Sequence, residues 1–161
     1  MIERKLLFLV NPISGTRKKE KLIGFITDKL NAVNISFEIE FTNATGNYTL
    51  LNEDVVSKRI TDIIIVGGDG SVNQVVQGFA SLPVRFGILP VGSGNGLARA
   101  AGIPTKIKKA LQVIIDGHTM PVDAFTINEM FSCMLSGLGF DAQVAHNFAR
   151  KAKRGFFNYT K

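Results

Sequence analysis

The sequence has a single cysteine, Cys133, so an internal disulfide is excluded. It has no run approaching the roughly 20 apolar residues of a membrane-spanning helix, and its first residues lack the apolar core of a signal peptide. We therefore expect a cytoplasmic protein. Acidic residues are scarcer than basic ones, 13 against 19, and the net charge of +6 suits an anionic partner such as a nucleotide, a nucleic acid or a membrane surface.

Two common phosphate-binding fingerprints are also missing. No Gly-Lys-Ser or Gly-Lys-Thr occurs, which excludes a P-loop. The glycines of 92–96 follow the spacing G-x-G-x-G, whereas a dinucleotide-binding turn has the spacing G-x-G-x-x-G. What is present, 161 residues of which 45% are hydrophobic, is typical of about one globular domain.

The stretch 62–79 combines a buried strand, a glycine turn and a helix. Ile63 to Val66 is an unbroken β-branched run, which is typical of a central parallel strand covered on both faces. The glycines at 67, 68 and 70 allow a sharp turn, with positive φ, and let backbone amides approach an anionic ligand. Asp69 is unusual there, because a carboxylate repels phosphate unless it binds a metal ion or a proton. An apolar stripe at helical spacing follows, formed by Val72, Val75, Val76 and Phe79.

Most of the chain alternates strands with helices in the same way. Expected strands lie at 5–10, 35–41, 62–66 and 84–89, with helices between them and after the last one. Polar and apolar residues alternate from 35 to 41, which predicts a strand near a sheet edge. We predict an α/β fold of three layers, a mostly parallel sheet with helices on both faces.

The chain turns after each expected strand, at 11–15, 42–46, 67–71 and 91–96. In open α/β sheets, ligands bind in the crevice at this carboxyl edge. Ser93 and Asn95 have a structural alternative as a helix cap, and Thr105 is expected to cap a later helix. Basic residues crowd the start of the first helix and indicate either a solvated face or phosphate contact: Arg17, Lys18, Lys19 and Lys21.

The pattern changes near residue 120. Strands are expected at 119–127 and 130–136, joined through Asn128 and Glu129 as a hairpin, and a helix is expected from Ala142. We therefore divide the chain into an α/β nucleotide-binding domain, 1–118, and the beginning of a truncated β-sandwich domain, 119–161.

Four segments, in this order and spacing, resemble the diacylglycerol kinase catalytic family, the lipid kinases that include sphingosine and ceramide kinases and bacterial relatives. They are Asn11-Pro-Ile-Ser-Gly15, Thr42 with Thr45-Gly46, Gly67-Gly-Asp-Gly-Ser-Val-Asn73 and Pro90-Val-Gly-Ser-Gly-Asn95. The segment Gly137-Leu-Gly-Phe-Asp-Ala142 is similar to the one that opens the family's second domain. The resemblance spans about half of a family member. It implies an ATP site between the two domains and phosphoryl transfer to a lipid hydroxyl.

The resemblance also implies roles for particular residues. Asp69 would be the catalytic residue, and its carboxylate would either bind Mg²⁺ or act as a general base. The sequence departs from the family at Gln74, Asn47 and Gly96, where Glu, His and Asp are common, and Gly96 resembles the sphingosine and ceramide kinase branch. The residues implied to contact the nucleotide are Asn11, Ser14, Gly15, Thr42, Gly68, Asp69, Gly70, Ser71, Val72, Asn73 and Ser93.

The expected activity is therefore that of an ATP- and Mg²⁺-dependent lipid kinase, with a diacylglycerol- or sphingoid-like alcohol as acceptor. We expect the 161-residue chain to be inactive by itself. Peripheral contact with an anionic membrane surface and formation of a homo-oligomer are left open. No interleaving of aromatic and basic residues supports a nucleic-acid partner. The alternatives are a non-catalytic nucleotide-binding or regulatory module, and an NAD kinase-like enzyme, which shares a Gly-Gly-Asp-Gly loop.

Overall fold

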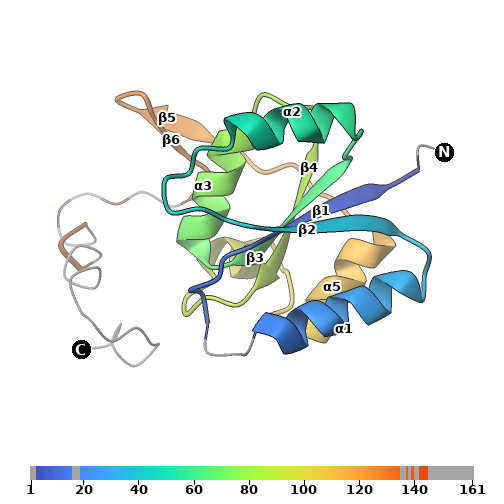
Figure 1. Cartoon of the computed structure of the whole chain (residues 1–161). Helices are drawn as coiled ribbons and strands as arrows, with labels where there is room; N and C mark the ends of the chain where they lie inside the picture. The colour runs from blue at the N-terminus through green and yellow to red at the C-terminus, as the bar shows by residue number, and fades with distance from the viewer. Residues whose placement is uncertain (1–2, 16–18, 135–136, 138, 140–141, 145–161) are drawn as a thin grey trace.

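A four-stranded parallel sheet is at the centre of the structure (Figure 1). The computed structural model describes residues 3–15, 19–134, 137, 139 and 142–144. The strand order is β2-β1-β3-β4. The strands are β1 (Lys5–Val10), β2 (Ser36–Phe41), β3 (Asp62–Gly67) and β4 (Arg85–Pro90).

Helices cover both faces of this sheet. On one face, α1 (Lys19–Asn31) and α5 (Ile107–Asp116) pack against it. The other face carries α2 (Thr49–Ser57), α3 (Asp69–Phe79) and the short α4 (Gly96–Ala100). The predicted three-layer α/β fold with a parallel sheet is confirmed.

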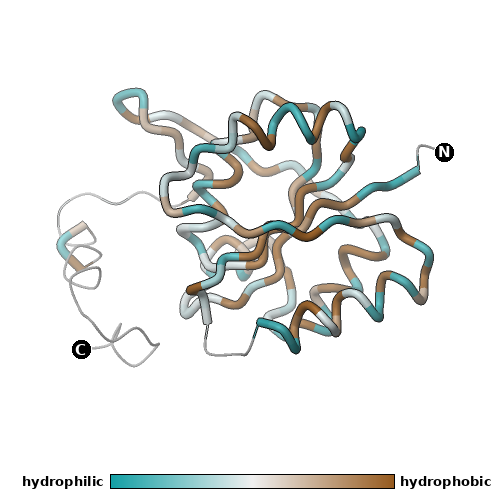
Figure 2. The backbone as a smooth tube through the Cα atoms, viewed as in Figure 1, coloured by the Kyte–Doolittle hydropathy of each residue, from teal (hydrophilic) through white to brown (hydrophobic). Residues whose placement is uncertain are grey.

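The β3 strand explains why the layers form as they do. All six of its residues are buried, and alternate side chains pack into the hydrophobic cores on opposite faces of the sheet. Ile64 and Val66 pack with α1 and α5, whereas Ile63 and Ile65 pack with α2 and α3. Burying each such side chain contributes roughly 1.5–3 kcal/mol. Hydrophobic residues accordingly gather along the central strands in Figure 2.

The edge position predicted for residues 35–41 is confirmed. β2 pairs only with β1 among the described strands, and Phe41 at its end is 56% exposed. Between β2 and β3 the expected helix is present as α2, with Tyr48 and Lys58 as its flanking cap residues.

A small antiparallel hairpin follows the sheet. Its strands are β5 (Phe125–Ile127) and β6 (Met130–Ser132). Asn128 and Glu129 join them with φ values of 47° and 67°, as a tight two-residue hairpin turn requires. The strands are shorter than predicted because residues 119–124 lie beside the sheet without pairing in it.

Several predictions concern residues that the structure does not describe. The segment at 137–142 and the helix expected from Ala142 lie almost entirely outside the described residues, as do Arg17 and Lys18. The domain boundary at 118/119 stays a prediction. Within the part of the chain that is described, no helix combines the length and apolar character needed to cross a membrane.

Candidate functional site

The turns at the carboxyl edge of the sheet meet where the chain order reverses. From β1 the chain goes first to β2 on one side and then to β3 on the other, which makes the gap between β1 and β3 the switch point. A hydrogen bond of 2.6 Å spans this gap, from Asn11 Nδ2 after β1 to Ser71 Oγ in α3. The sequence-predicted loops after β1 and β3 therefore form one site.

Asn11 also organises its own loop. Its backbone N–H donates to the Val66 carbonyl of β3 at 3.0 Å, which continues the sheet by one step. Its Oδ1 accepts from the Ile13 N–H, and its carbonyl accepts from the Ser14 hydroxyl, both at 3.0 Å. A small polar side chain at this position thus both closes the turn and reaches the neighbouring loop.

Close backbone packing, rather than positive φ, explains the glycine at 68. Gly68 has φ −105° and ψ −173°, and none of Gly67, Gly68 and Gly70 has a positive φ. The expected left-handed turn is therefore wrong, because β3 leads into α3 through extended backbone. A Cβ added at Gly68 would lie 3.1 Å from Gly92 Cα, and one added at Gly92 would lie 2.5 Å from Gly68 Cα. The two glycine loops touch here.

Gly70 has a different surrounding. It is the second residue of α3, it is exposed, and a Cβ added to it would meet nothing within 4 Å. Packing within the described chain therefore does not demand glycine at this position. The amides of the first helical turn have no intrahelical acceptor, whereas Val72 N–H already donates to the Gly68 carbonyl at 3.0 Å. Open space beside such amides suits a phosphate group.

Asp69 lies beside these amides and connects the two glycine loops. Its Oδ1 accepts a hydrogen bond of 3.2 Å from the backbone N–H of Leu97, in the first turn of α4. A Cβ added at Gly94 would lie 3.2 Å from Asp69 Oδ2, and one at Gly96 3.7 Å from Oδ1. Glycine at both positions thus leaves room around the carboxylate.

Asn95 supports the second loop without capping α4 through its side chain. It adopts the left-handed conformation, with φ 54°. Its Oδ1 accepts from the Gly92 N–H at 3.0 Å and its Nδ2 donates to the Gly92 carbonyl at 2.8 Å. Asn95 is the N-cap residue of α4, as the structural alternative predicted, but no side-chain cap hydrogen bond forms. Ser93 is exposed at the loop's tip.

The remaining sequence-predicted residues take varied positions. Thr42 is half-buried, and its N–H donates to the Val10 carbonyl at 3.0 Å. Val72 is 2% exposed and packs in the core beneath α3. Asn73 accepts from the Cys133 N–H at 3.0 Å and donates to the Phe131 carbonyl at 3.3 Å, so its amide holds the hairpin. The roles of these three as nucleotide ligands stay predictions.

Gln74 points toward the loop after β2. A Cβ added at Gly46, whose φ is +70°, would lie 2.7 Å from Gln74 Nε2. The side chain at position 74 therefore fills the space beside the loop at 42–46. Sequence reasoning could identify the substitution but not this contact, because the two residues are brought together only by tertiary packing.

A polar cavity of about 210 Å³ adjoins the loops after β1 and β4. Ser14 and Gly15 line it from one loop, Gly92 and Asn95 from the other, and Thr105 lies beside α5. Thr105 does not cap α5 as expected, because Lys106 is the N-cap residue and no side-chain cap bond forms. Sequence reasoning did not anticipate that Lys19 reaches into this cavity.

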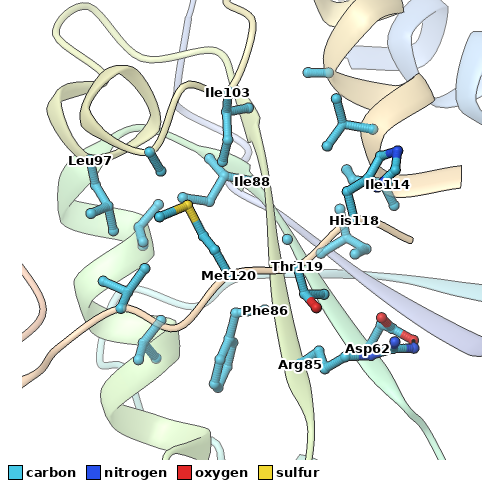
Figure 3. A pocket seen from close by; sticks show the side chains of 18 of the residues that line it. Asp62, Arg85, Phe86, Ile88, Leu97, Ile103, Ile114, His118, Thr119 and Met120 are labelled. Atoms are coloured by element: carbon cyan, nitrogen blue, oxygen red, sulfur yellow. Dashed lines mark hydrogen bonds and ion pairs between the residues drawn. The ribbon is translucent and has the colours of Figure 1, made fainter. Parts of the chain in front are cut away.

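A larger, mainly apolar cavity of about 480 Å³ lies beside β4, away from the glycine loops (Figure 3). Figure 3 shows Asp62 and Arg85 at one end, Leu97 at the other and Met120 between them. Burial by itself would raise the pKa of Asp62, but hydrogen bonds from Thr61, Arg4 and Arg85 hold it below its usual value. This ion cluster stabilises the amino end of the sheet.

In the described residues, the Asp69 carboxylate is the candidate ligand for Mg²⁺. They contain no cluster of three or more His, Cys, Asp or Glu side chains suited to a metal ion. Asp69 Oδ2 has no hydrogen-bond partner within that part of the chain. A carboxylate oxygen next to the open amides of a helix start fits Mg²⁺, which is usually bound by one or two carboxylates together with phosphates and water.

The fold and this site define an α/β domain with two glycine-rich turns in contact at the switch point of its sheet. Residues 5–127 match the model of the diacylglycerol kinase catalytic domain, and the chain belongs to this family. The predicted resemblance is confirmed.

Named relatives are similar over nearly the whole chain. A diacylglycerol kinase of Staphylococcus carnosus is 29% identical over 154 residues, 94% of this chain and 50% of the relative. One of Staphylococcus haemolyticus is 33% identical over 147 residues, 90% of this chain and 44% of the relative. The crystal structure of a diacylglycerol kinase from Bacillus anthracis has a TM-score of 0.68 at 32% identity, covering 80% of this chain and 45% of that one. The chain spans about half the length of the curated relatives it matches.

Proposed function

We propose that the full-length protein is an ATP-dependent lipid kinase, which transfers the terminal phosphate of ATP to a lipid hydroxyl. The observation that carries this proposal is the juxtaposition of Asp69 with the open first turn of α3 at Gly70. Membership of the diacylglycerol kinase catalytic domain family supports it.

The residues at the switch point suit the nucleotide. The amides of Asp69, Gly70 and Ser71 would bind phosphate oxygens, and the Asn11–Ser71 contact holds the two loops at a fixed separation. Phosphoryl transfer depends mainly on positioning and charge neutralisation, and Mg²⁺ would supply part of that neutralisation. Asp69 would hold the ion through Oδ2 while Oδ1 remains bonded to Leu97 N–H.

The acceptor is proposed to be a diacylglycerol- or sphingoid-like alcohol. Gly96 leaves the Asp69 carboxylate without a second acid at that position, as in the sphingosine and ceramide kinase branch. A net charge of +6 supports peripheral contact with an anionic membrane surface, where such acceptors lie.

A nucleotide-binding module without transfer is the second candidate. The specific observation in its favour is the hydrogen bond between Asp69 and Leu97, which gives the acid a structural role independent of chemistry. In that case Asp69 would hold α4 in place beside a phosphate cradle.

A transfer assay separates the two candidates. The full-length protein is incubated with labelled ATP, Mg²⁺ and a panel of lipid alcohols that includes diacylglycerol, sphingoid bases and polyprenols. Label in one lipid class identifies a kinase and its acceptor. ATP binding by calorimetry without label in any lipid would favour the module. Absence of ATP binding would contradict both.

A further inference from the structure

The polar cavity beside the glycine loops contains one ammonium group. Lys19, the first residue of α1, extends its side chain under the loop at 11–15. Its Nζ donates to the Ser14 carbonyl oxygen and, at 3.0 Å, to Ser14 Oγ. An ammonium group has three N–H donors, so one donor remains for another partner.

Among the residues that the structure describes, no carboxylate neutralises Lys19. Within the described part of the chain, every ion pair involves other residues, and Lys19 pairs with no Asp or Glu. Burial lowers the pKa of Lys19, since the protonated form loses hydration in the cavity. A half-buried cation without a counter-charge is a site at which an anion would be stabilised.

Hydrogen bonds connect Lys19 to the phosphate-binding turn. Ser14, which accepts from Lys19, donates through its hydroxyl to the Asn11 carbonyl at 3.0 Å. Asn11 in turn donates to Ser71 Oγ in the first turn of α3 at 2.6 Å. Lys19 is therefore two residues removed, along a continuous polar chain, from the amides proposed to hold phosphate. The cavity also contacts Gly92, whose backbone touches Gly68.

Mg²⁺ would neutralise part of the charge of a triphosphate, but the other proposed protein ligands supply no positive charge. Asn11, Ser14, Ser71 and the α3 amides are neutral, and Asp69 carries a negative charge. Hydrogen bonds from a charged donor to phosphate are about twice as strong as neutral ones. The sequence leaves the basic residues near 17–21 undecided between a solvated face and phosphate contact. The position of Lys19 inside the cavity favours phosphate contact.

We propose that the ammonium group of Lys19 binds a phosphate group of the nucleotide in this cavity. The inference rests on the proposed function, because it names a further ligand of the same site. A lysine that merely fastened the loop would stabilise the fold equally with or without phosphate. Binding that depends on the phosphates of the ligand therefore distinguishes the two roles.

The test compares three variants of the full-length protein by calorimetry with ATP, adenosine and inorganic pyrophosphate. Lys19→Met keeps the length of the side chain and removes its charge. Lys19→Arg keeps the charge, and Lys21→Met removes an exposed cation from the same helix as a matched control. Circular dichroism establishes that each variant is folded, and Lys19→Gln replaces Lys19→Met if the latter is not.

We expect Lys19→Met to weaken ATP binding by about tenfold or more, as for loss of a hydrogen bond from a charged donor. Adenosine binding should be unchanged, Lys19→Arg should recover part of the ATP affinity, and Lys21→Met should change it less than about twofold. Equal ATP affinity in wild type and Lys19→Met overturns the inference and leaves the proposed function intact. Equal losses for ATP and adenosine also overturn it.

The pyrophosphate arm separates this inference from the proposed function. If the full-length wild-type protein binds pyrophosphate but not ATP, and Lys19→Met abolishes the binding, Lys19 is an anion ligand and the proposed nucleotide site is wrong. If the full-length wild-type protein binds neither ligand, both the inference and the proposed function are overturned.

Discussion

The backbone N–H of Leu97 donates to Oδ1 of Asp69 at 3.2 Å, across 28 residues of sequence. The acid of the first glycine loop therefore fixes the start of the helix that follows the second loop. The Asp69 side chain can therefore have a structural role, a role in phosphoryl transfer, or both. A structural role needs only an oxygen acceptor at Oδ1, whereas a role in phosphoryl transfer needs the charge.

Asp69→Asn separates these roles. The amide oxygen can still accept from Leu97, so we expect the thermal unfolding midpoint to stay close to wild type. The charge is lost, and lipid phosphorylation by the full-length protein should fall by about 100-fold or more. Asp69→Ala is the control that also removes the acceptor, and its unfolding free energy should fall by about 0.5–2 kcal/mol. Wild-type turnover in Asp69→Asn would show that Asp69 is not catalytic.

The glycines at 68 and 70 should respond differently to the same substitution. Gly70→Val places its side chain in open space beside the α3 amides, so ATP affinity should fall without loss of the packing around it. Gly68→Val presses against Gly92, so both ATP affinity and the unfolding midpoint should fall. Ser93→Ala removes at most one hydrogen bond, worth about 1 kcal/mol.

Calorimetry and thermal unfolding of these three variants give the check. A larger loss of ATP affinity in Ser93→Ala than in Gly70→Val would mean that the loop at 67–71 is not the main phosphate cradle.

The sequence predicts much of the fold because the relevant signals are local. The β-branched run Ile63 to Val66 and the alternation at 35–41 are complete within single strands, and both positions in the sheet are confirmed. The reason for glycine at 68 is not local. It depends on Gly92, which approaches only after two further elements have folded, so sequence reasoning assigned a positive φ that the backbone does not adopt.

In the candidate site, too, the sequence predicts local features but not contacts that depend on tertiary packing. Turns at the carboxyl ends of parallel strands share one edge, so the sequence predicts that Asn11 and Ser71 lie at the same edge. Their hydrogen bond also requires β1 and β3 to be neighbours, a strand order that the sequence does not predict. The partners of individual amides do not follow. Asn95 bonds to its own loop instead of capping α4 with its side chain, and Asn73 bonds to a hairpin about 60 residues further on. Each choice depends on which backbone group the fold leaves within reach.

Asp62 should make stability depend on acidic pH. Its folded pKa lies below its usual value, so its contribution is present above the unfolded pKa, about 3.9, and is lost as the pH falls through the lower folded value. Asp62→Asn weakens the bonds from Arg4 and Arg85 to a nearly buried side chain, and should lower the unfolding free energy at pH 7 by about 1–3 kcal/mol.

Chemical denaturation at pH 7 and across the acid range measures this effect. Asp54→Asn is the matched control, since Asp54 pairs with Lys58 at the surface and such pairs contribute about 0–1 kcal/mol. In Asp62→Asn the decline in stability below pH 4 should be shallower than in wild type. An equally steep decline would mean that other carboxylates dominate.

The 161-residue chain should bind nucleotide without phosphorylating lipid. It contains the α/β domain, but it spans only about half the length of its relatives, and Met130 in its hairpin is 73% exposed. Holding an acceptor hydroxyl in line with phosphate is worth about 7–11 kcal/mol in favourable cases, and this chain offers no second wall for that purpose in its described residues. Lipid phosphorylation at the rate of the full-length protein would contradict this expectation.

Asn73 should control access to the only thiol of the chain. Its Oδ1 accepts from the Cys133 N–H at 3.0 Å and lies 3.5 Å from Sγ, and Cys133 is 7% exposed. Asn73→Ala removes the bonds from α3 to the backbone of Phe131 and Cys133 and leaves these part-buried backbone groups unpaired, at a cost of about 1–3 kcal/mol each. The hairpin should then open more often, and an alkylating reagent should label Cys133 about tenfold faster at a fixed pH.

Asn52→Ala is the matched control, because Asn52 donates to the Gly78 carbonyl on the far side of α3 and its loss should leave labelling unchanged. Equal labelling rates in wild type and Asn73→Ala would show that other contacts hold the hairpin against α3.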